Sequence, residues 1–324
     1  MNSSYYYSRL TDDKKAIYKT ILAGLKAFDK EIKIQLMPMN EITMIFNYVL
    51  FDNPLIFYVS QSFQQLRDLY NKKCFIVPEY KYPKPLSKEF TTAITKYLQV
   101  FDSLKEKSDL DKELFVHNYC LETFTYDYQF GDSAHSVLGV VMNKTAVCEG
   151  IAKFVKLAFD YLGLSSLVVV GKAKSQAYND KMEPHAWNIV KINGNTYHLD
   201  VTFDMTLTTK MNRYDYFNLS EEDIKKDHII TGDIPACTIV GNDYFSTNLL
   251  IMHSRAEFEN HIVKSLKQNK KNILVKITNI QNTKDIADKI MEIAVQQYGK
   301  IYNSSVKLEI GYNLNQMVFE INFK

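Results

Sequence analysis

The sequence predicts an α+β protein with antiparallel sheets, and three observations support this class. Residues 145–163, TAVCEGIAKFVKLAFDYLG, carry apolar side chains at helical spacing behind a single cysteine. Residues 183–204, EPHAWNIVKINGNTYHLDVTFD, hold an Asn-Gly dipeptide between two alternating runs, which is the strongest short signal of a β-hairpin. The tail from about residue 246 follows the order helix, strand, helix, strand, strand.

Elements of both kinds are expected along the first part of the chain. Helices are predicted from apolar spacing and end signals over residues 11–31, 40–54, 88–106 and 111–124. Short strands are predicted over residues 31–36, 55–60 and 74–77. Segment 78–89, PEYKYPKPLSKE, contains three prolines and is the best linker candidate. We therefore divide the chain into an N-terminal mixed region, a central core and a C-terminal α+β module, spanning residues 1–85, 86–245 and 246–324.

The bulk composition is that of an ordinary globular protein. The 324 residues are 46% hydrophobic and 23% charged, with a formal net charge of +2. This balance is too mild to indicate a nucleic-acid partner, and we expect none. No apolar run approaches the length of a membrane span, so we expect no membrane-spanning segment. The sequence leaves the oligomeric state open.

Cysteine usage argues against disulfides and metal alike. The four cysteines are widely spaced and include no Cys-x-x-Cys pair: Cys74, Cys120, Cys148 and Cys237. That pattern is neither a disulfide framework nor a zinc ribbon, and we expect no metal and no cofactor. The N-terminal residues lack a basic region followed by an apolar one. The default location is the cytoplasm, or outside the cell or on its surface if a leader was trimmed.

Cys148 opens the predicted helix over residues 148–162. It precedes Ile151 by three positions and so shares the apolar stripe, while charged side chains fall on the opposite stripe. A buried core cysteine is one interpretation. The other is a nucleophile, because the unpaired amide groups and the macrodipole of a helix start favour a thiolate. Position alone does not decide between them.

The predicted hairpin supplies an imidazole and a carboxylate. A two-residue turn at Asn193–Gly194 places Trp187 opposite Asp200, which makes His185 and Asp200 diagonal neighbours on one face. An acid that orients an imidazole, together with a thiol, is what thiol-based acyl transfer requires. His198 falls on the same face and is an alternative imidazole, and Asp204 is a weaker alternative carboxylate.

At these residues the chain resembles the transglutaminase-like superfamily of cysteine enzymes, in particular its bacterial members. The resemblance is carried by AVCEGIAKFVKLAFDYLG, HAWNIVKINGNTYHLDVTFD, RYDYFNLSEEDIKKDH and YDYQFGDSAHSVLGVV, and is strong over about residues 115–230. It implies a papain-like core in which the cysteine helix packs on an antiparallel sheet. It further implies a catalytic triad of Cys148, His185 and Asp200, with Trp187 as the aromatic beside the histidine. His135 is a candidate donor to the oxyanion.

We therefore expect a cysteine enzyme that acts on amide bonds of a protein or peptide through a thioester. Hydrolysis, as a peptidase or amidase, is favoured because water is always present. A transglutaminase that passes the acyl group to an amine is the near alternative, and a non-catalytic binding scaffold is the alternative from another class. Peptide-glycan amidases of the superfamily are disfavoured because their paired Cys-x-x-Cys zinc site is missing. Calcium-dependent animal crosslinking enzymes are disfavoured because the flanks do not fit their β-sandwich domains.

Overall fold

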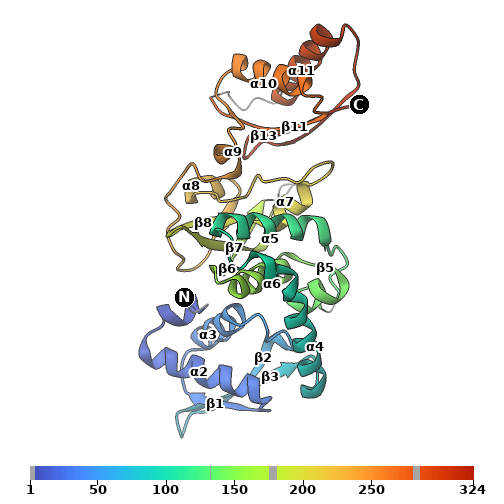
Figure 1. Ribbon diagram of the computed structural model, residues 1–324. Coiled ribbons are helices and arrows are strands. Elements are labelled where there is room, and N and C mark those ends of the chain that lie inside the picture. Colours follow the sequence, from blue (N-terminus) through green and yellow to red (C-terminus); the bar gives the residue numbers. More distant parts are fainter. Residues whose placement is uncertain (1–3, 132, 175–180, 280–284) are drawn as a thin grey trace. The chain divides into compact units, whose positions relative to one another are not determined.

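A computed structural model describes residues 4–131, 133–174, 181–279 and 285–324 of the chain (Figure 1). The chain divides into two compact units, each built from three segments. Unit 1 consists of Met1–Lys172, Pro184–Thr196 and Ile230–Pro235, and unit 2 of Ala173–Glu183, Tyr197–Ile229 and Ala236–Lys324. Among the described residues, no helix is both long enough and apolar enough to cross a membrane.

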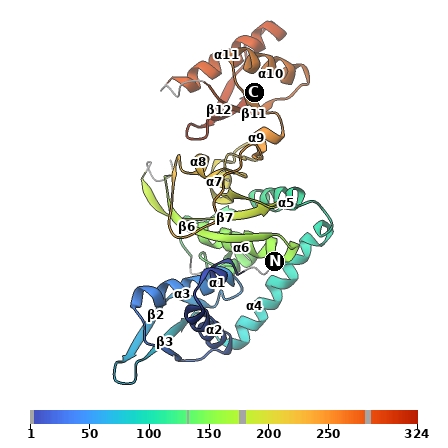
Figure 2. The same cartoon turned by 90° about the vertical axis from the view of Figure 1, so that its left-hand side faces the viewer.

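The N-terminal part of unit 1 packs helices against a small antiparallel sheet of order β1-β3-β2. Its helices are α1 (Tyr5–Arg9), α2 (Asp12–Ala27) and α3 (Met39–Asp52), and its strands are β1 (Ile32–Gln35), β2 (Val59–Asp68) and β3 (Lys73–Tyr80). Helix α2 ends where Phe28 adopts a left-handed conformation, with φ of 65°. Figure 2 shows β2 and β3 side by side as a hairpin, in which β3 is the central strand of this sheet.

Residues 84–162 of unit 1 are mostly helical. The elements of this segment are α4 (Lys84–Tyr97), η1 (Leu98–Leu104), α5 (Asp109–Thr123), β4 (Thr125–Tyr126), η2 (Gly139–Asn143), β5 (Thr145–Ala146) and α6 (Cys148–Leu162). Strands β4 and β5 pair in parallel immediately before the cysteine. Aromatic side chains of η1, α5 and α6 pack together, with Phe101 edge to face against Tyr119 and tilted against Phe154. This packing holds α6 in the interior of unit 1.

A second, four-stranded sheet has the order β8-β7-β6-β9. Its strands are β6 (Ser165–Lys174), β7 (Met182–Ile192), β8 (Asn195–Leu199) and β9 (His228–Ile230). Asn193 and Gly194 form the turn between β7 and β8, with φ of 49° and 90°. Two successive positive φ values are the signature of a tight type I′ hairpin turn, so the predicted hairpin and its turn are confirmed.

The C-terminal part of unit 2 is an α+β module. Its elements are β10 (Ile251–Met252), α10 (Arg255–Lys267), β11 (Asn272–Ile277), α11 (Ile286–Tyr302), β12 (Leu308–Asn313) and β13 (Val318–Phe323). They follow the predicted order from α10 onward, and the one short strand β10 was not predicted. The sheet order is β10-β11-β13-β12, with β13 antiparallel to both of its neighbours. Phe258, Ile290 and Phe319 are buried in a shared core beneath α10 and α11.

Mixed helix and strand content with antiparallel sheets is thus confirmed, and two details of the first hundred residues are wrong. The predicted strand over residues 55–60 begins only at Val59, because Asn53–Pro54 leads into consecutive turns. The predicted linker 78–89 is mostly ordered structure: β3 runs to Tyr80 and α4 begins at Lys84. Proline at the first turn of a helix loses no hydrogen bond, which is why α4 accommodates Pro85 as its second residue. The three-part division of the chain stays a prediction.

Candidate active site

Cys148 is the first residue of α6 and differs from the other cysteines in its exposure. Val147 caps the helix in an extended conformation, and Gly163 ends it with φ of 78°. Cys148 is half-buried, whereas Cys74, Cys120 and Cys237 are completely buried. Burial also raises the pKa of the Cys120 thiol, which makes that side chain unreactive. Of the four cysteines, Cys148 is therefore the one open to a reagent or substrate.

Helix α6 is buried on both of its stripes. The apolar stripe lies in the core as predicted, but the charged stripe is also covered: Lys156 is fully buried, and Glu149 and Lys153 are each 8% exposed. The lysines tolerate burial because each pairs with an acid one turn away, Lys153 with Glu149 and Lys156 with Asp160. The Lys156 Nζ also donates to the Ser166 carbonyl oxygen at 3.3 Å. The periodic pattern of a helix alone does not distinguish a charged stripe that is exposed to solvent from one that is buried with its charges paired.

The first turn of α6 is fixed by a close approach of the preceding chain. A Cβ atom at Gly150 would lie 2.2 Å from the Ala134 carbonyl oxygen and 2.8 Å from the Ala146 Cβ. Such contacts are impossible, so only glycine fits behind the cysteine and its neighbour. The Val147 amide donates to the same Ala134 oxygen at 3.1 Å. Residues 134–136 are thereby held across the start of the helix, which places His135 next to Glu149.

Glu149 is the acid of a compact charged cluster beside Cys148. Its Oε2 lies 3.1 Å from the His135 Nδ1 and its Oε1 lies 2.5 Å from the Lys153 Nζ, while Gln61 of β2 donates to the same Oε1. Burial by itself raises the pKa of the Glu149 carboxyl, but Lys153 and His135 more than offset this and the pKa falls to about 2. The carboxylate is therefore ionised at neutral pH and holds the half-exposed His135 ring in place.

His185 lies on β7 beside Trp187, as the hairpin predicts. The two rings are nearly parallel, with centroids 6.0 Å apart. Trp187 is fully buried, whereas His185 retains partial exposure. Farther along β7, the Asn188 Nδ2 donates to the Ala152 carbonyl oxygen of α6 at 2.9 Å. This bond ties the strand that carries the histidine to the helix that carries the cysteine.

Asp200 follows β8 directly and is fully buried. Its Oδ1 accepts the Phe203 amide at 3.0 Å, so it caps the short helix α7 (Val201–Leu207). Its Oδ2 lies 3.0 Å from the Nε2 of His228, the first residue of β9. This cap turns the chain into a helix at Val201, so strand β8 of the hairpin ends at Leu199.

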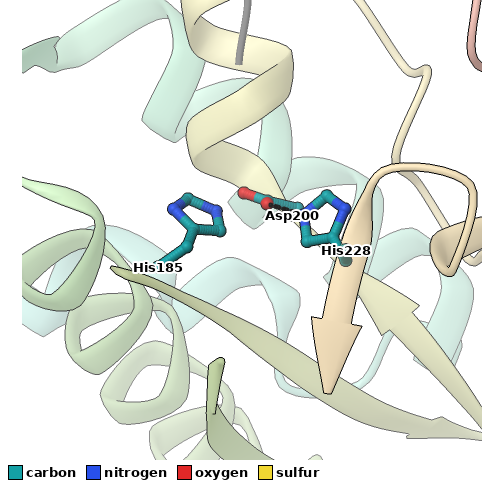
Figure 3. A group of neighbouring side chains, drawn as sticks. All are labelled: His185, Asp200 and His228. Carbon is teal, nitrogen blue, oxygen red and sulfur yellow. Dashed lines mark hydrogen bonds and ion pairs between the residues drawn. The ribbon is translucent and has the colours of Figure 1, made fainter. Parts of the chain in front are cut away.

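His185, Asp200 and His228 form a group in which one ligand-type atom from each lies within 4.8 Å of the others. Figure 3 shows the Asp200 carboxyl group between the two imidazole rings. Among the described residues this is the group that could hold a metal ion. However, both ring nitrogens of His228 already contact carboxylate oxygens, at Asp200 and at Asp227. Hydrogen bonding therefore accounts for the arrangement better than metal binding.

The alternative imidazole and carboxylate from the sequence, His198 and Asp204, are both buried and have structural roles. His198 is fully buried, and burial, with help from the nearby His228 charge, lowers its pKa to about 3. Its ring is therefore neutral at physiological pH, which suits a core residue better than a proton carrier. Asp204 is also fully buried and accepts the Tyr216 amide at 3.1 Å. That carboxylate anchors the chain after α7.

His228 was missed by the sequence reasoning. It lies at the end of RYDYFNLSEEDIKKDH, one of the segments that carry the family resemblance. A local signal existed, because Asp227 and His228 are adjacent and their side chains contact at 2.6 Å. Its partner Asp200 is 28 positions away, and no periodicity links the two. The convergence of Cys148 with His185 and Asp200 stays a prediction.

Comparison with known proteins points to one superfamily. Residues 99–201 match the sequence model of the transglutaminase-like superfamily, a segment that contains Cys148, His185 and Asp200. No curated protein sequence matches the chain. A solved structure titled "Crystal structure of a TGase" is similar at 17% identity and a TM-score of 0.32, over 56% of this chain and 53% of that one.

A second solved structure, described as a "Putative Cysteine Protease from Cytophaga hutchinsonii", is similar at 11% identity and a TM-score of 0.29. The similarity covers 44% of this chain and 63% of that one. The chain thus spans less than two thirds of the length of either structure. Residues 99–201, which include the cysteine helix and the hairpin, are similar to the transglutaminase-like superfamily.

Proposed function

We propose that the chain is a cysteine-dependent enzyme that cleaves amide bonds of a protein or peptide through a thioester. One observation carries the proposal: the segment matched to the superfamily contains the single half-buried cysteine, at the first residue of α6. An accessible thiol at a helix start is where a thiolate is favoured and a carbonyl carbon can approach it.

The proposed triad assigns one role to each of three residues. The Cys148 thiolate attacks the carbonyl carbon, and His185 then gives a proton to the departing amine. Asp200 holds the His185 ring in one tautomer and orientation, which its buried carboxylate beside that ring supports. Water attacks the thioester in the second half-reaction, with His185 accepting its proton, and the thiol is restored. The triad thus needs the cysteine helix to pack on the sheet that carries His185, and the bond from Asn188 to α6 supports this packing.

The oxyanion of the tetrahedral intermediate needs donors near the cysteine. The first backbone amides of a helix have no intrahelical acceptor, so those at the start of α6 are available to an anion. His135 remains the side-chain candidate. Its Nδ1 contacts Glu149 at 3.1 Å, which leaves the Nε2 as the ring atom that could donate.

Selective alkylation tests the proposal. We expect iodoacetamide at pH 6 to modify Cys148 well before Cys74, Cys120 and Cys237, because the last three are buried and an ion-paired thiolate reacts below the ordinary pH range of a thiol. His185→Ala should slow the reaction, and the exposed His253 provides a matched control in His253→Ala. Peptide mapping by mass spectrometry gives the rate at each cysteine. Equal rates at all four, or an unaffected rate in His185→Ala, contradict the proposal.

The acyl acceptor is tested separately. Incubation with dimethylcasein and dansylcadaverine distinguishes fragments, which indicate hydrolysis, from fluorescent casein, which indicates transfer to an amine. We expect fragments without incorporated amine, and Cys148→Ser should abolish them. Amine incorporation at intact chain length favours the transglutaminase. Neither product, together with unselective alkylation, favours a binding scaffold.

A further inference from the structure

A continuous chain of buried hydrogen bonds lies behind Asp200, and all of it belongs to unit 2. The His228 Nε2 lies 3.0 Å from Asp200 and the His228 Nδ1 lies 2.6 Å from Asp227. The Tyr216 hydroxyl donates to the other oxygen of Asp227 at 2.6 Å, and the Asn313 Nδ2 donates to that hydroxyl at 3.1 Å. Every member is at most 5% exposed. A polar chain this well covered is strongly coupled and holds its members in one arrangement.

Both ring nitrogens of His228 contact carboxylate oxygens. An ionised carboxylate only accepts hydrogen bonds, and a neutral imidazole has one donor, so donation to both acids requires the imidazolium form. Tyr216 contacts Asp227 as a donor. Burial and the Asp227 carboxylate raise the pKa of the Tyr216 hydroxyl well above its ordinary value, so the hydroxyl keeps its proton and donates a hydrogen bond to Asp227. A cation between two anions is also the arrangement with the most favourable electrostatics in a buried site.

The groups around His228 agree with this charge. Acids flank the ring at Asp200 and Asp227, and His198 of β8 is held neutral, with a pKa lowered to about 3 by burial and by His228. The rings of Phe203 and Tyr216 cover the imidazole at centroid distances of 4.8 and 5.6 Å.

We propose that His228 is a positioning residue, an imidazolium held between Asp227 and Asp200 that fixes the Asp200 carboxylate for its work on His185. This rests on the proposed function of the triad. Asp200 is then held at both oxygens, by the Phe203 amide at Oδ1 and by His228 at Oδ2. Rotation of the carboxylate would break both bonds at once, so its orientation is set before substrate binds.

The same chain of hydrogen bonds connects the C-terminal module to Asp200. Asn313, at the end of β12, is its last member. The Asn313 Oδ1 accepts the amides of Asn315 and Gln316 at 3.1 and 3.3 Å, so the donor to Tyr216 is held by the loop between β12 and β13. The module thus supports Asp200 through Tyr216, Asp227 and His228 in turn.

Two conservative substitutions separate positioning from packing. In His228→Gln the side-chain amide replaces the Nε2 donor toward Asp200, whereas in His228→Asn it replaces the Nδ1 donor toward Asp227. We expect the rate of Cys148 alkylation by iodoacetamide at pH 6 to fall about tenfold in His228→Asn and less than about threefold in His228→Gln. The acid limb of the rate profile between pH 5 and 8 should move to higher pH in His228→Asn alone. Equal effects of the two variants, or no effect, overturn the proposal.

The charge of His228 is tested in the unaltered protein, whether or not the enzyme is active. Nitrogen-15 NMR of histidine-labelled protein at pH 7 should show both ring nitrogens of His228 protonated, with assignment by loss of the signals in His228→Gln. One unprotonated nitrogen overturns the inference. If the NMR result holds but Cys148 shows no selective alkylation, the triad is wrong and the buried imidazolium stands. This measurement also decides the matter if His228→Asn does not fold.

Discussion

The start of α6 and the chain behind Asp200 place reactive groups in opposite environments. Cys148 is half-buried, and its neighbour Glu149 pairs with a His135 side chain that is 55% exposed. Asp200 and Asp227 are completely buried, and His228 is 2% exposed. A nucleophile must be reached by its substrate, whereas an orienting acid works best where water cannot compete for its hydrogen bonds. The proposed triad therefore draws its nucleophile from an accessible environment and its orienting acid from a buried one.

The two regions also differ in how far apart their partners lie in the sequence. Glu149 and Lys153 are one helical turn apart, and His135 is 14 positions from Glu149. In the other region Asp200 and His228 are 28 positions apart, and Tyr216 and Asn313 are 97 apart. Contacts within and close to α6 hold most of the first region, with Gln61 of β2 as a distant partner, whereas contacts between distant segments hold the second. Substitutions in the second should therefore disturb more of the fold.

The largest expected effect is that of Asp227→Asn. The substitution removes one anion from a buried group and leaves the His228 charge with a single acid, so we expect a loss of about 4 kcal/mol in the free energy of unfolding. Urea denaturation followed by circular dichroism measures it. Glu221→Gln is the control, because its exposed pair with Lys225 should contribute less than about 1 kcal/mol. Similar losses of unfolding free energy in Asp227→Asn and Glu221→Gln would mean that the buried ion pairs contribute no more to stability than an exposed one.

The elements that carry the candidate residues could be predicted because their signals are local. The cysteine helix, its glycine end at Gly163 and the Asn193–Gly194 turn each follow from a few adjacent residues. The hairpin brings His185 and Asp200 into one neighbourhood, as its predicted turn requires. The helices α10 and α11 and the strands β11, β12 and β13 of the C-terminal module could be predicted in the same way, whereas the two-residue strand β10 could not.

The remainder could not be predicted because it depends on contacts between distant segments. Nothing near Asp200 indicates that it caps a helix or accepts from His228. Nothing near Lys156 indicates that this lysine is fully buried, since its Asp160 partner would sit equally well on a solvated stripe. Charged residues with satisfied partners look the same in sequence whether they are exposed or covered.

The next effect in size is the pH dependence that Glu149 gives to stability. Its folded-state pKa of about 2 is below the unfolded value of 4.5, so its contribution is complete above pH 4.5 and is lost as the pH falls toward 2. We expect Glu149→Gln to be less stable by about 2 kcal/mol at pH 6, because solvent at His135 screens part of the interaction. Urea titrations at pH 6 and pH 3 measure the difference in free energy of unfolding between the wild type and Glu149→Gln, and this difference should be smaller at pH 3.

Two further results bear on the Glu149 prediction. Glu259→Gln, which breaks the more exposed pair with Arg255, should change stability little at either pH. A constant difference between wild type and Glu149→Gln from pH 6 to pH 3 would mean that the glutamate acts through packing rather than charge. In that case packing would stabilise the cluster of Glu149, Lys153 and His135, despite the exposure of His135, as it stabilises the buried chain behind Asp200.

The smallest expected effect is at the far end of the buried chain, in Asn313→Ala. The variant loses the bond to the Tyr216 hydroxyl, which keeps its donation to Asp227, so we expect about 1 kcal/mol less stability. Alkylation of Cys148 at pH 6 should slow by about twofold, because the loss reaches Asp200 only through three intervening side chains. The exposed neighbour Asn315 gives a matched control in Asn315→Ala. If Asn313→Ala slows alkylation no more than this control, the C-terminal module stabilises the fold without supporting the site.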